Sequence, residues 1–295
     1  KKAISQCMEE AKLTDLLDLK AKHKVESWIE GRKVSDSTKK RQTAYFKSLG
    51  DTAVKSWEHL LTKNPFANLE AEAPALVVPE VFTVAECRNL ASDKALAHEW
   101  GLIGATLLYT GMRLMEAVHL HWDRIYLEDH QRYADVVPPT KAEHAEGARV
   151  KRGKHRTVPL PQELVEILAR TPLEQRKGYL FPNEARLRSR KWHWAKFQGW
   201  CSAVAVAIEG RHPHSLRHTR ACIGLAGGES DLTLRLALGH ADNDMSAWYA
   251  QSAMRLKAEL NHWKGEIRLR DPLHISRNSI GEKRGISINQ DRALA

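Results

Sequence analysis

The chain has 295 residues, 42% of them hydrophobic, which is enough for two domains with sizeable cores. Its 46 lysines and arginines against 36 acidic residues give a net charge of +10, which favours a polyanionic partner: nucleic acid first, an anionic membrane second. A basic protein without such a partner is the alternative. The four cysteines form no CxxC pair and no apolar run reaches about twenty residues, so a disulfide framework, a zinc site and a membrane span are not predicted, and a reducing, cytoplasmic setting is expected.

Residues 4–69 are predicted to be helical, because apolar residues recur there at helix spacing. A basic cluster lies in the middle of this region and suits contact with a DNA backbone. A solvated helix face is an equally strong interpretation of such a cluster. The cluster consists of Lys39, Lys40, Arg41 and Lys47.

The segment 68–79 (NLEAEAPALVVP) is the best candidate for an interdomain linker, since its two prolines interrupt any helix. Thr83 and Glu86 follow it with the spacing of a capping box, which predicts the start of a helix.

Residues 101–125 (GLIGATLLYTGMRLMEAVHLHWDRI) are predicted to form one helix. Arg113 and Glu116 then stand at positions i and i+3, where the carboxylate can orient the guanidinium. An ordinary exposed ion pair is the alternative, but the preceding LIGATLLY is apolar enough to be buried. We therefore predict that the Arg113–Glu116 pair is positioned against the buried part of the domain instead of lying exposed on its surface.

From Ile125 to Leu160 the pattern changes to β-strands. Residues 133–137 and 156–160 are rich in β-forming residues, and Gly147 and Gly153 are candidate turn residues. A further helix is predicted from Pro161.

A basic run interleaved with tryptophans follows at 186–196 (RLRSRKWHWAK). Such a run suits a helix that lies along DNA, with cations on phosphates and rings on sugars or base edges. The alternative places the tryptophans in the core and the basic side chains in solvent. The cations concerned are Arg186, Arg188, Arg190 and Lys191.

The segment 212–249 carries the densest chemistry in the chain. Pro213 favours a helix start, so that His214, Arg217 and His218 share one helical face. Glycines at 227 and 228 end this helix, and an amphipathic run then leads to Gly239-His240 and on to Tyr249. A guanidinium binds phosphate, an imidazole moves protons and a phenol can attack phosphorus, so this set of side chains suits work on a phosphate.

Beyond Tyr249 an apolar stripe needs a partner surface, and residues 271–295 are predicted to be a mobile tail. Packing on its own domain is the commoner fate of such a stripe. Its members are Ala253, Leu256, Leu260, Trp263 and Ile267.

Three motifs in this order resemble those of the tyrosine recombinases, the phage-integrase family. They are Thr110-Gly-Met-Arg113 with Glu116, His214-Ser-Leu-Arg217-His218, and Leu238-Gly-His240, with Tyr249 at the position of the family's nucleophile. The resemblance implies a mainly α fold with a small antiparallel β-sheet. It also implies a helical core-binding domain at 1–68, a linker at 69–80, a mixed α+β catalytic domain at 81–270 and a tail at 271–295. The chain begins at Lys1 rather than Met, which is compatible with a fragment, and the presence of an N-terminal arm-binding domain in the whole protein is left open.

The resemblance also assigns roles within the site. Arg113 and Arg217 bind the scissile phosphate, His214 assists proton transfer, His240 hydrogen-bonds the phosphate, and Tyr249 attacks it to form a 3′-phosphotyrosine. Glu116 and His218 are supporting residues. By the same resemblance the general acid is a lysine on a β-hairpin. The register of the hairpin selects Lys151, and Lys154 and Lys141 are the alternatives. If Lys154 is not the general acid, it is expected to contact DNA.

The expected function is site-specific strand cleavage and rejoining on double-stranded DNA, in a prokaryotic cytoplasm and for a mobile genetic element. A homo-tetramer is expected to align two DNA sites, with the C-terminal helix docked in trans. No cofactor is expected. A metal at His212, His214 and His218 is disfavoured because no carboxylate or cysteine stands at supporting spacing nearby, and because Arg217 among them would repel a cation. A type IB topoisomerase and a non-catalytic DNA-binding regulator of the same fold are the alternatives.

Overall fold

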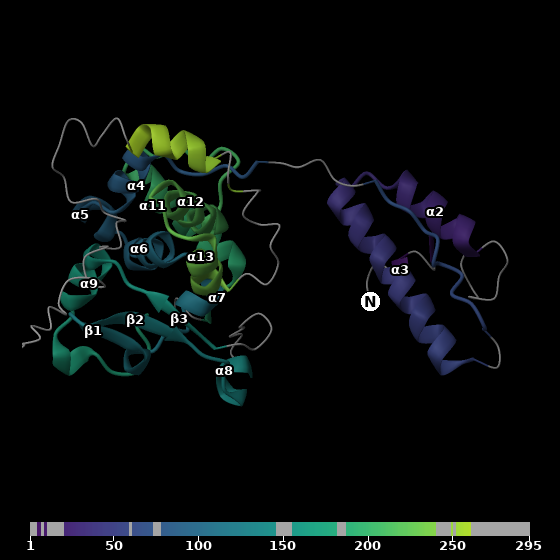
Figure 1. Ribbon diagram of the computed structural model, residues 1–295, viewed down its shortest axis with the longest axis horizontal. Coiled ribbons are helices and arrows are strands. Elements are labelled where there is room, and N and C mark those ends of the chain that lie inside the picture. Colours follow the sequence, from purple (N-terminus) through teal and green to yellow (C-terminus); the bar gives the residue numbers. More distant parts are fainter. Residues whose placement is uncertain are drawn as a thin grey trace, which may run out of the picture. The chain divides into compact units, whose positions relative to one another are not determined.

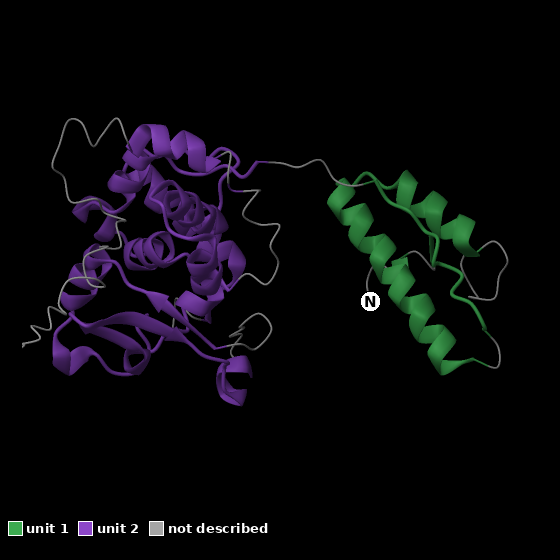
Figure 2. Ribbon diagram, in the orientation of Figure 1, with its two compact units in different colours: residues 1–77 green, residues 78–295 purple. Residues whose placement is uncertain are grey.

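The chain divides into two compact units, residues 1–77 and residues 78–295 (Figure 2). The boundary falls inside the segment 69–80. The computed structural model describes residues 5–6, 9–10, 21–58, 61–72, 78–145, 155–181, 187–239, 249 and 252–260.

The first unit is built on two helices, α2 (Ala21–Gly31) and α3 (Asp36–Ser56). Their facing sides bury a small aromatic core in which Phe46 stands edge-on to Trp28 and to Phe66, with ring centroids 6.2 and 5.6 Å apart. Gly50 lets the later segment approach α3 closely, because a Cβ at this position would meet the Asn64 side chain. The Asn64 side chain also donates a hydrogen bond to the carbonyl of Lys47.

The second unit combines many short helices with one small sheet, which confirms the predicted fold class (Figure 1). Among the described residues no helix has the length and apolar character that crossing a bilayer requires. In chain order the elements are α4 (Val84–Leu90), α5 (Asp93–Leu96), α6 (Gly101–Thr110), α7 (Leu114–Ala117), η1 (Trp122–Arg124), β1 (Ile125–Glu128), β2 (Gln131–Val136), α8 (Lys141–Ala145), β3 (Arg156–Pro159), α9 (Gln162–Ala169), η3 (Leu173–Gln175), α11 (Arg190–Ala203), α12 (Pro213–Ala226) and α13 (Asp231–Leu238), and residues 252–260 are also helical.

Helix α6 is the centre of this unit (Figure 1). Every residue of α6 except Leu102 is buried, as expected for a helix that is apolar on all sides. Gly104 allows the Trp200 ring to lie directly on the helix, since a Cβ there would come within 2.5 Å of the ring. Trp200 in turn lies in an aromatic cluster with Trp100 and Phe197.

The prediction of one helix over 101–125 is wrong. Helix α6 ends at Thr110 because Gly111 adopts the left-handed conformation, with φ of +65°, and Arg113 then caps the separate short helix α7. The break turns the backbone so that Arg113 and Glu116 form a helix cap instead of an exposed pair along one helix.

The sheet has the order β1-β2-β3 and is antiparallel throughout. Ala134 pairs with Ile125 on one side and with Val158 on the other, and both Ala134 and Val158 are buried. Between β2 and β3 the chain forms helix α8, where Thr140 and Glu143 cap each other reciprocally. Lys141 is the first residue of α8 and is exposed, so it does not lie on a strand.

Candidate functional site

Helix α12 begins as the sequence predicted. Pro213 occupies its first turn, and His212 precedes it as the cap. The helix is buried from Ser215 to Gly224, so its polar side chains enter the interior of the unit instead of solvent. His214 and His218 lie one turn apart with their ring centroids at 4.7 Å, which confirms the shared face.

Arg217 is almost fully buried, with 1% of its surface exposed. Its guanidinium donates hydrogen bonds of 2.6 Å to the carbonyl of Gly111 and of 2.6 Å to that of Leu238. These carbonyls belong to the C-terminal ends of α6 and α13, and both helices stop at a left-handed glycine. Arg217 therefore fixes two helix ends to α12. Burial first, and then the charge of Arg113, lowers the pKa of Arg217.

Tyr249 lies against α12 with only 2% of its surface exposed. Its hydroxyl is 3.0 Å from Nδ1 of His218. Burial raises the pKa of Tyr249 to about 12, and burial together with the neighbouring His214 lowers the pKa of His218 to about 3. At neutral pH the phenol is thus protonated and the imidazole is neutral. In the tautomer with its proton on Nε2, the His218 ring accepts a hydrogen bond from the Tyr249 hydroxyl. Sequence reasoning paired the tyrosine with His214 instead; only the packing of residue 249 on α12 distinguishes the two histidines.

Glu116 holds Arg113 at two points. One carboxylate oxygen accepts from the backbone N–H of Arg113 at 2.9 Å, and the other accepts from its guanidinium at 2.9 Å. The Glu116 side chain is fully buried, whereas 23% of the Arg113 side chain is exposed. Within the described part of the chain, the Arg113 side chain therefore has a fixed partner and still reaches the surface.

A third arginine joins this group and was not singled out from the sequence. Arg156, at the start of β3, pairs with the same Glu116 carboxylate. An arginine that opens a β-strand carries no signal of its own, and its partner lies 40 positions away in the sequence. Only the tertiary structure brings the two together.

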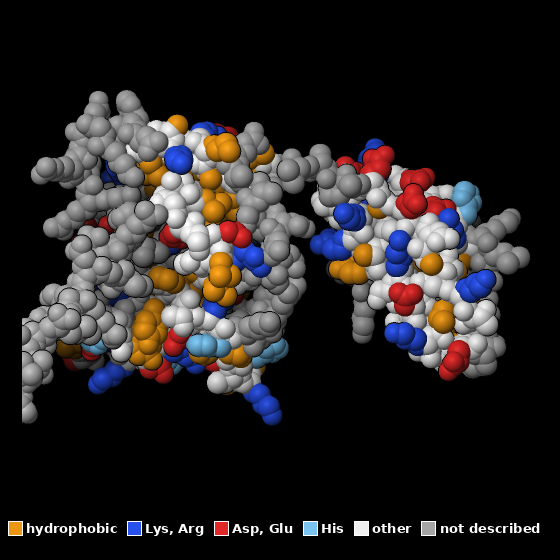
Figure 3. Space-filling model, viewed as in Figure 1, with side chains coloured by type: hydrophobic (Ala, Val, Ile, Leu, Met, Phe, Trp, Pro, Cys, Tyr) orange, Lys and Arg blue, Asp and Glu red, His pale blue; other side chains and the backbone are white. Residues whose placement is uncertain are grey.

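The predicted DNA contacts have different surroundings. On α3, Lys40 and Arg41 are exposed, whereas Lys39 and Lys47 are half-buried, and Lys39 donates to the carbonyl of Glu30. Basic and acidic side chains are interspersed on the visible face of this unit, so the face shown is not uniformly basic (Figure 3).

In the second unit, Arg188, Arg190 and Lys191 are all exposed at the start of α11. Arg188 lies over the half-buried ring of Trp192, with 5.9 Å between its guanidinium carbon and the ring centroid. The face of α11 that enters the core carries His193, Phe197 and Trp200.

Four residues predicted for the site or for DNA contact lie outside the described residues: Lys151, Lys154, Arg186 and His240. The predicted lysine hairpin falls between Ala145 and His155, the nearest described residues on either side. Gly239 is the last described residue before His240.

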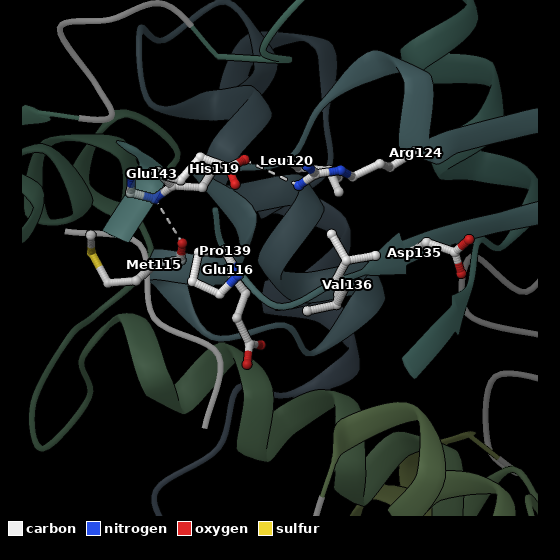
Figure 4. Close-up of a pocket in the computed structure, with 10 residues that line it drawn as sticks. Met115, Glu116, His119, Leu120, Arg124, Asp135, Val136, Pro139 and Glu143 are labelled. Carbon is white, nitrogen blue, oxygen red and sulfur yellow. Dashed lines mark hydrogen bonds and ion pairs between the residues drawn. The ribbon is translucent and has the colours of Figure 1, made fainter. Parts of the chain in front are cut away.

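A small pocket beside Glu116 does not extend the site. It lies between α7, β2 and α8, and Figure 4 shows the Glu116 carboxylate turned away from the Arg124–Glu143 ion pair on its wall. Among the described residues no group of three or more histidine, cysteine or acidic side chains is arranged to hold a metal ion.

The helix after Tyr249 packs on its own unit over residues 252–260. Ala253, Leu256 and Leu260 are buried, and the Glu259 carboxylate accepts a hydrogen bond of 3.0 Å from the backbone N–H of Val84 at the start of α4. These residues of the apolar stripe therefore pack on their own domain, which is the commoner arrangement for such a stripe. Trp263 and Ile267 lie outside the described residues.

Comparisons with known proteins agree with this geometry. The pattern that defines the phage integrase family matches residues 84–255, more than half of the chain. The integrase of Haemophilus phage HP1 is 27% identical over 226 residues, which cover 74% of this chain and 57% of that protein. The tyrosine recombinase XerC of Herpetosiphon aurantiacus is 26% identical over 261 residues, covering 77% of each chain.

Two solved structures share the fold at low sequence identity. The Tn1549 transposon integrase in complex with transposon right end DNA has a TM-score of 0.64 and 17% identity, covering 89% of this chain and 93% of that one. The XerH site-specific recombinase bound to a palindromic difH substrate has a TM-score of 0.59 and 18% identity, covering 82% and 71%.

The fold and the family match together define the class of this protein: it belongs to the phage integrase family of tyrosine recombinases. The family prediction made from the three motifs is therefore confirmed. The matched region spans 57% of the length of the HP1 integrase.

Proposed function

We propose that this chain is a site-specific tyrosine recombinase that cleaves and rejoins DNA strands through a 3′-phosphotyrosine intermediate. The observation that carries the proposal is the contact between the Tyr249 hydroxyl and His218, on the same helix as the buried Arg217. All three residues lie within the segment that matches the family.

The electrostatics of the site favour a bound phosphodiester. Arg113, Arg156 and Arg217 bring three positive charges to a region whose buried carboxylate is Glu116. The lowered pKa of Arg217 reflects a guanidinium that is destabilised by burial and by Arg113. A phosphate bound between Arg113 and Arg217 offsets both the burial of Arg217 and its repulsion by Arg113. Its negative charge stabilises the poorly solvated guanidinium cation.

In the proposed reaction the Tyr249 oxygen forms a bond to phosphorus, and the bond from phosphorus to the 5′-oxygen breaks. The phenolic proton passes to a histidine, and the leaving 5′-oxygen takes a proton from a lysine between β2 and β3. That lysine is Lys151 by register, with Lys154 and, at the start of α8, Lys141 as alternatives. Arg113 and Arg217 stabilise the charge on the non-bridging oxygens, and His240 donates a hydrogen bond to the phosphate. Loss of one such preorganised donor costs on the order of 3–4 kcal/mol, and loss of a general acid typically costs about 10²–10⁴-fold in rate.

His218 is the histidine that contacts the nucleophile, so we propose that it receives the phenolic proton first, once the charge of a bound phosphate stabilises the imidazolium and raises its pKa. The ring of His214 lies beside His218 and has a more exposed position at the start of α12. His214 is therefore placed to pass that proton on to solvent or to contact the phosphate.

His218 also predicts how stability depends on pH. Its folded pKa of about 3 lies below the ordinary value of 6.5, so the unfolded chain takes up the proton first as the pH falls. The stabilisation is fully present above about pH 6.5 and is lost as the pH falls towards 3, by about 2 kcal/mol at pH 5 relative to pH 7. The variant His218→Asn keeps an acceptor near the Nδ1 position and does not titrate. Chemical unfolding at pH 7 and pH 5 should therefore show a smaller loss for His218→Asn than for wild type, and equal losses would contradict the assignment.

Double-stranded DNA is the proposed substrate. The relatives include phage integrases, and the similar structures include a transposon integrase with transposon DNA and a recombinase with its difH site. We propose a mobile genetic element as the source of the DNA and a prokaryotic cytoplasm as the setting. The proposed assembly is a homo-tetramer on two sites, in which chain beyond residue 260 docks on a neighbouring protomer.

The first step of the test identifies the target site: duplexes that bind the Tyr249→Phe variant are selected from a random pool. The enriched sequence is then synthesised with a nick next to the cleavage position, so that the short 5′-hydroxyl fragment diffuses away after cleavage. Wild type, in EDTA, is expected to give a covalent adduct on a denaturing gel, with the protein on the 3′ end of the broken strand. A selected site that is bound but yields no adduct would favour the non-catalytic regulator.

A two-site assay separates the recombinase from the topoisomerase alternative. Two labelled duplexes of different length, each carrying the selected site, should exchange arms and give products of new length. Relaxation of a supercoiled plasmid without arm exchange would favour the topoisomerase.

A further inference from the structure

Arg156 makes the most extensive polar contacts of any arginine at this site. Its two terminal nitrogens donate to the two oxygens of Glu116, at 3.2 and 2.5 Å, and its Nε donates to the carbonyl of Ala237 at 2.9 Å. Only 10% of the Arg156 side chain is exposed. Such a contact requires the planar fork of a guanidinium, because a lysine ammonium does not match both carboxylate oxygens in this way.

The Glu116 carboxylate is shared between two arginines. Each of its oxygens accepts one hydrogen bond from Arg113 and one from Arg156. Burial alone raises the pKa of Glu116, but the hydrogen bonds and charge of Arg156, followed by those of Arg113, reverse this and hold the pKa below its ordinary value. Arg156 thus keeps the buried carboxylate ionised.

The sharing also sets the charge of the site. A buried Arg113–Glu116 pair by itself is neutral, whereas the three-residue cluster of Arg113, Glu116 and Arg156 has a net charge of +1. The excess charge is available at Arg113, which reaches the surface. An incoming phosphate therefore meets a cation whose charge is not cancelled by its own positioning carboxylate.

Arg156 further connects three elements that lie next to proposed catalytic residues. It opens β3, which follows Lys151 in the sequence, it binds Glu116 in α7, and it binds the last turn of α13, which precedes His240. The aliphatic part of the Arg156 side chain packs on the left-handed Gly239, which precedes His240. A Cβ at Gly239 would lie 3.1 Å from Cδ of Arg156.

We propose that Arg156 is a positioning residue for strand transfer, which acts through Glu116 on Arg113 and joins the start of β3 to the end of α13. This inference rests on the proposed recombinase function. It adds a residue that none of the three sequence motifs around Arg113, Arg217 and His240 contains.

The first test measures single-turnover cleavage of the nicked duplex by Arg156→Gln and Arg156→Lys. Loss of a residue that orients a functional group typically costs about 10–100-fold, which is the loss expected for Arg156→Gln. Arg156→Lys keeps the charge but not the fork, so its rate should lie between that of Arg156→Gln and wild type. In a Glu116→Gln background, Arg156→Gln should add less than threefold, since the residue acts through that carboxylate.

A second substrate separates positioning from a general structural role. Replacing one non-bridging oxygen of the scissile phosphate by methyl removes the charge that Arg113 neutralises. The deficit of Arg156→Gln relative to wild type should shrink on this methylphosphonate duplex, because charge at Arg113 then matters less. A purely structural defect would lower cleavage of both duplexes by the same factor and overturn the proposal.

Arg211→Gln is the matched control, because Arg211 is an equally enclosed arginine that pairs with Glu86 instead of Glu116. Its folded fraction should cleave at the wild-type rate. Thermal unfolding provides a readout without catalysis: the Arg156→Gln and Glu116→Gln effects on Tm should be strongly non-additive, and additive effects would contradict the coupling.

The outcomes also separate the two proposals. Cleavage by wild type with a rate for folded Arg156→Gln within threefold of it would overturn the role of Arg156 and leave the recombinase function standing. No adduct from wild type on a duplex that it binds would overturn both.

Discussion

Tyr249→Phe is expected to abolish the covalent DNA adduct while the protein still binds its selected duplex. The substitution removes one oxygen, which is the proposed nucleophile, and leaves the buried ring in place. It also removes the hydrogen bond to His218, which we expect to change the free energy of unfolding by only about 1 kcal/mol. The adduct is measured on a denaturing gel and binding by electrophoretic mobility, both in EDTA.

Tyr109→Phe is the matched control for this experiment. Tyr109 is a second buried tyrosine, on α6, whose pKa is also raised by burial. This variant should form adduct at the wild-type rate. An adduct from Tyr249→Phe, or its loss from Tyr109→Phe, would show that Tyr249 is not the nucleophile.

Arg217→Lys is expected to lower single-turnover cleavage by about 10²–10³-fold, although the charge is conserved. Lysine cannot reproduce the two hydrogen bonds with which Arg217 joins the ends of α6 and α13. The change therefore misplaces the phosphate-binding cation. It also leaves a buried carbonyl without a donor, at a cost of about 1–3 kcal/mol in the free energy of unfolding.

Arg220→Lys separates these two effects. Arg220 is a buried arginine on the same helix, and it pairs with Glu229 and with the carbonyl of Tyr109. A comparable loss of stability is expected for Arg220→Lys, with cleavage per folded molecule close to wild type. Equal loss of cleavage in both variants would indicate that stability of α12, and not phosphate binding by Arg217, controls the rate.

The mainly helical fold, its small sheet and the family were all predictable from local sequence. Periodicity marked the helices, β-forming residues marked β2 and β3, and Pro213 marked the start of α12. The one large error came from the same kind of signal. Residues 101–125 keep a helical pattern through Gly111, but the backbone turns there because a left-handed glycine costs little and allows Leu238 to approach.

The chemistry-bearing residues Arg113, Arg217 and Tyr249 were also visible in the sequence, because residue type and spacing within short motifs are local properties. What the motifs did not contain was the identity of each partner. Whether Tyr249 contacts His214 or His218 depends on where Tyr249 packs against α12. Whether Glu116 serves one arginine or two depends on where β3 lies relative to α7.

By itself, then, the sequence determined the class of protein, the main elements and the candidate reactive groups. The tertiary structure alone decided the burial of Arg217, the contact of Tyr249 with His218 and the second arginine on Glu116. The physical reason is the same in each case. Burial and the charge of neighbours distant in the sequence set the pKa and the orientation of a side chain, and neither is a property of the residues adjacent to it along the chain.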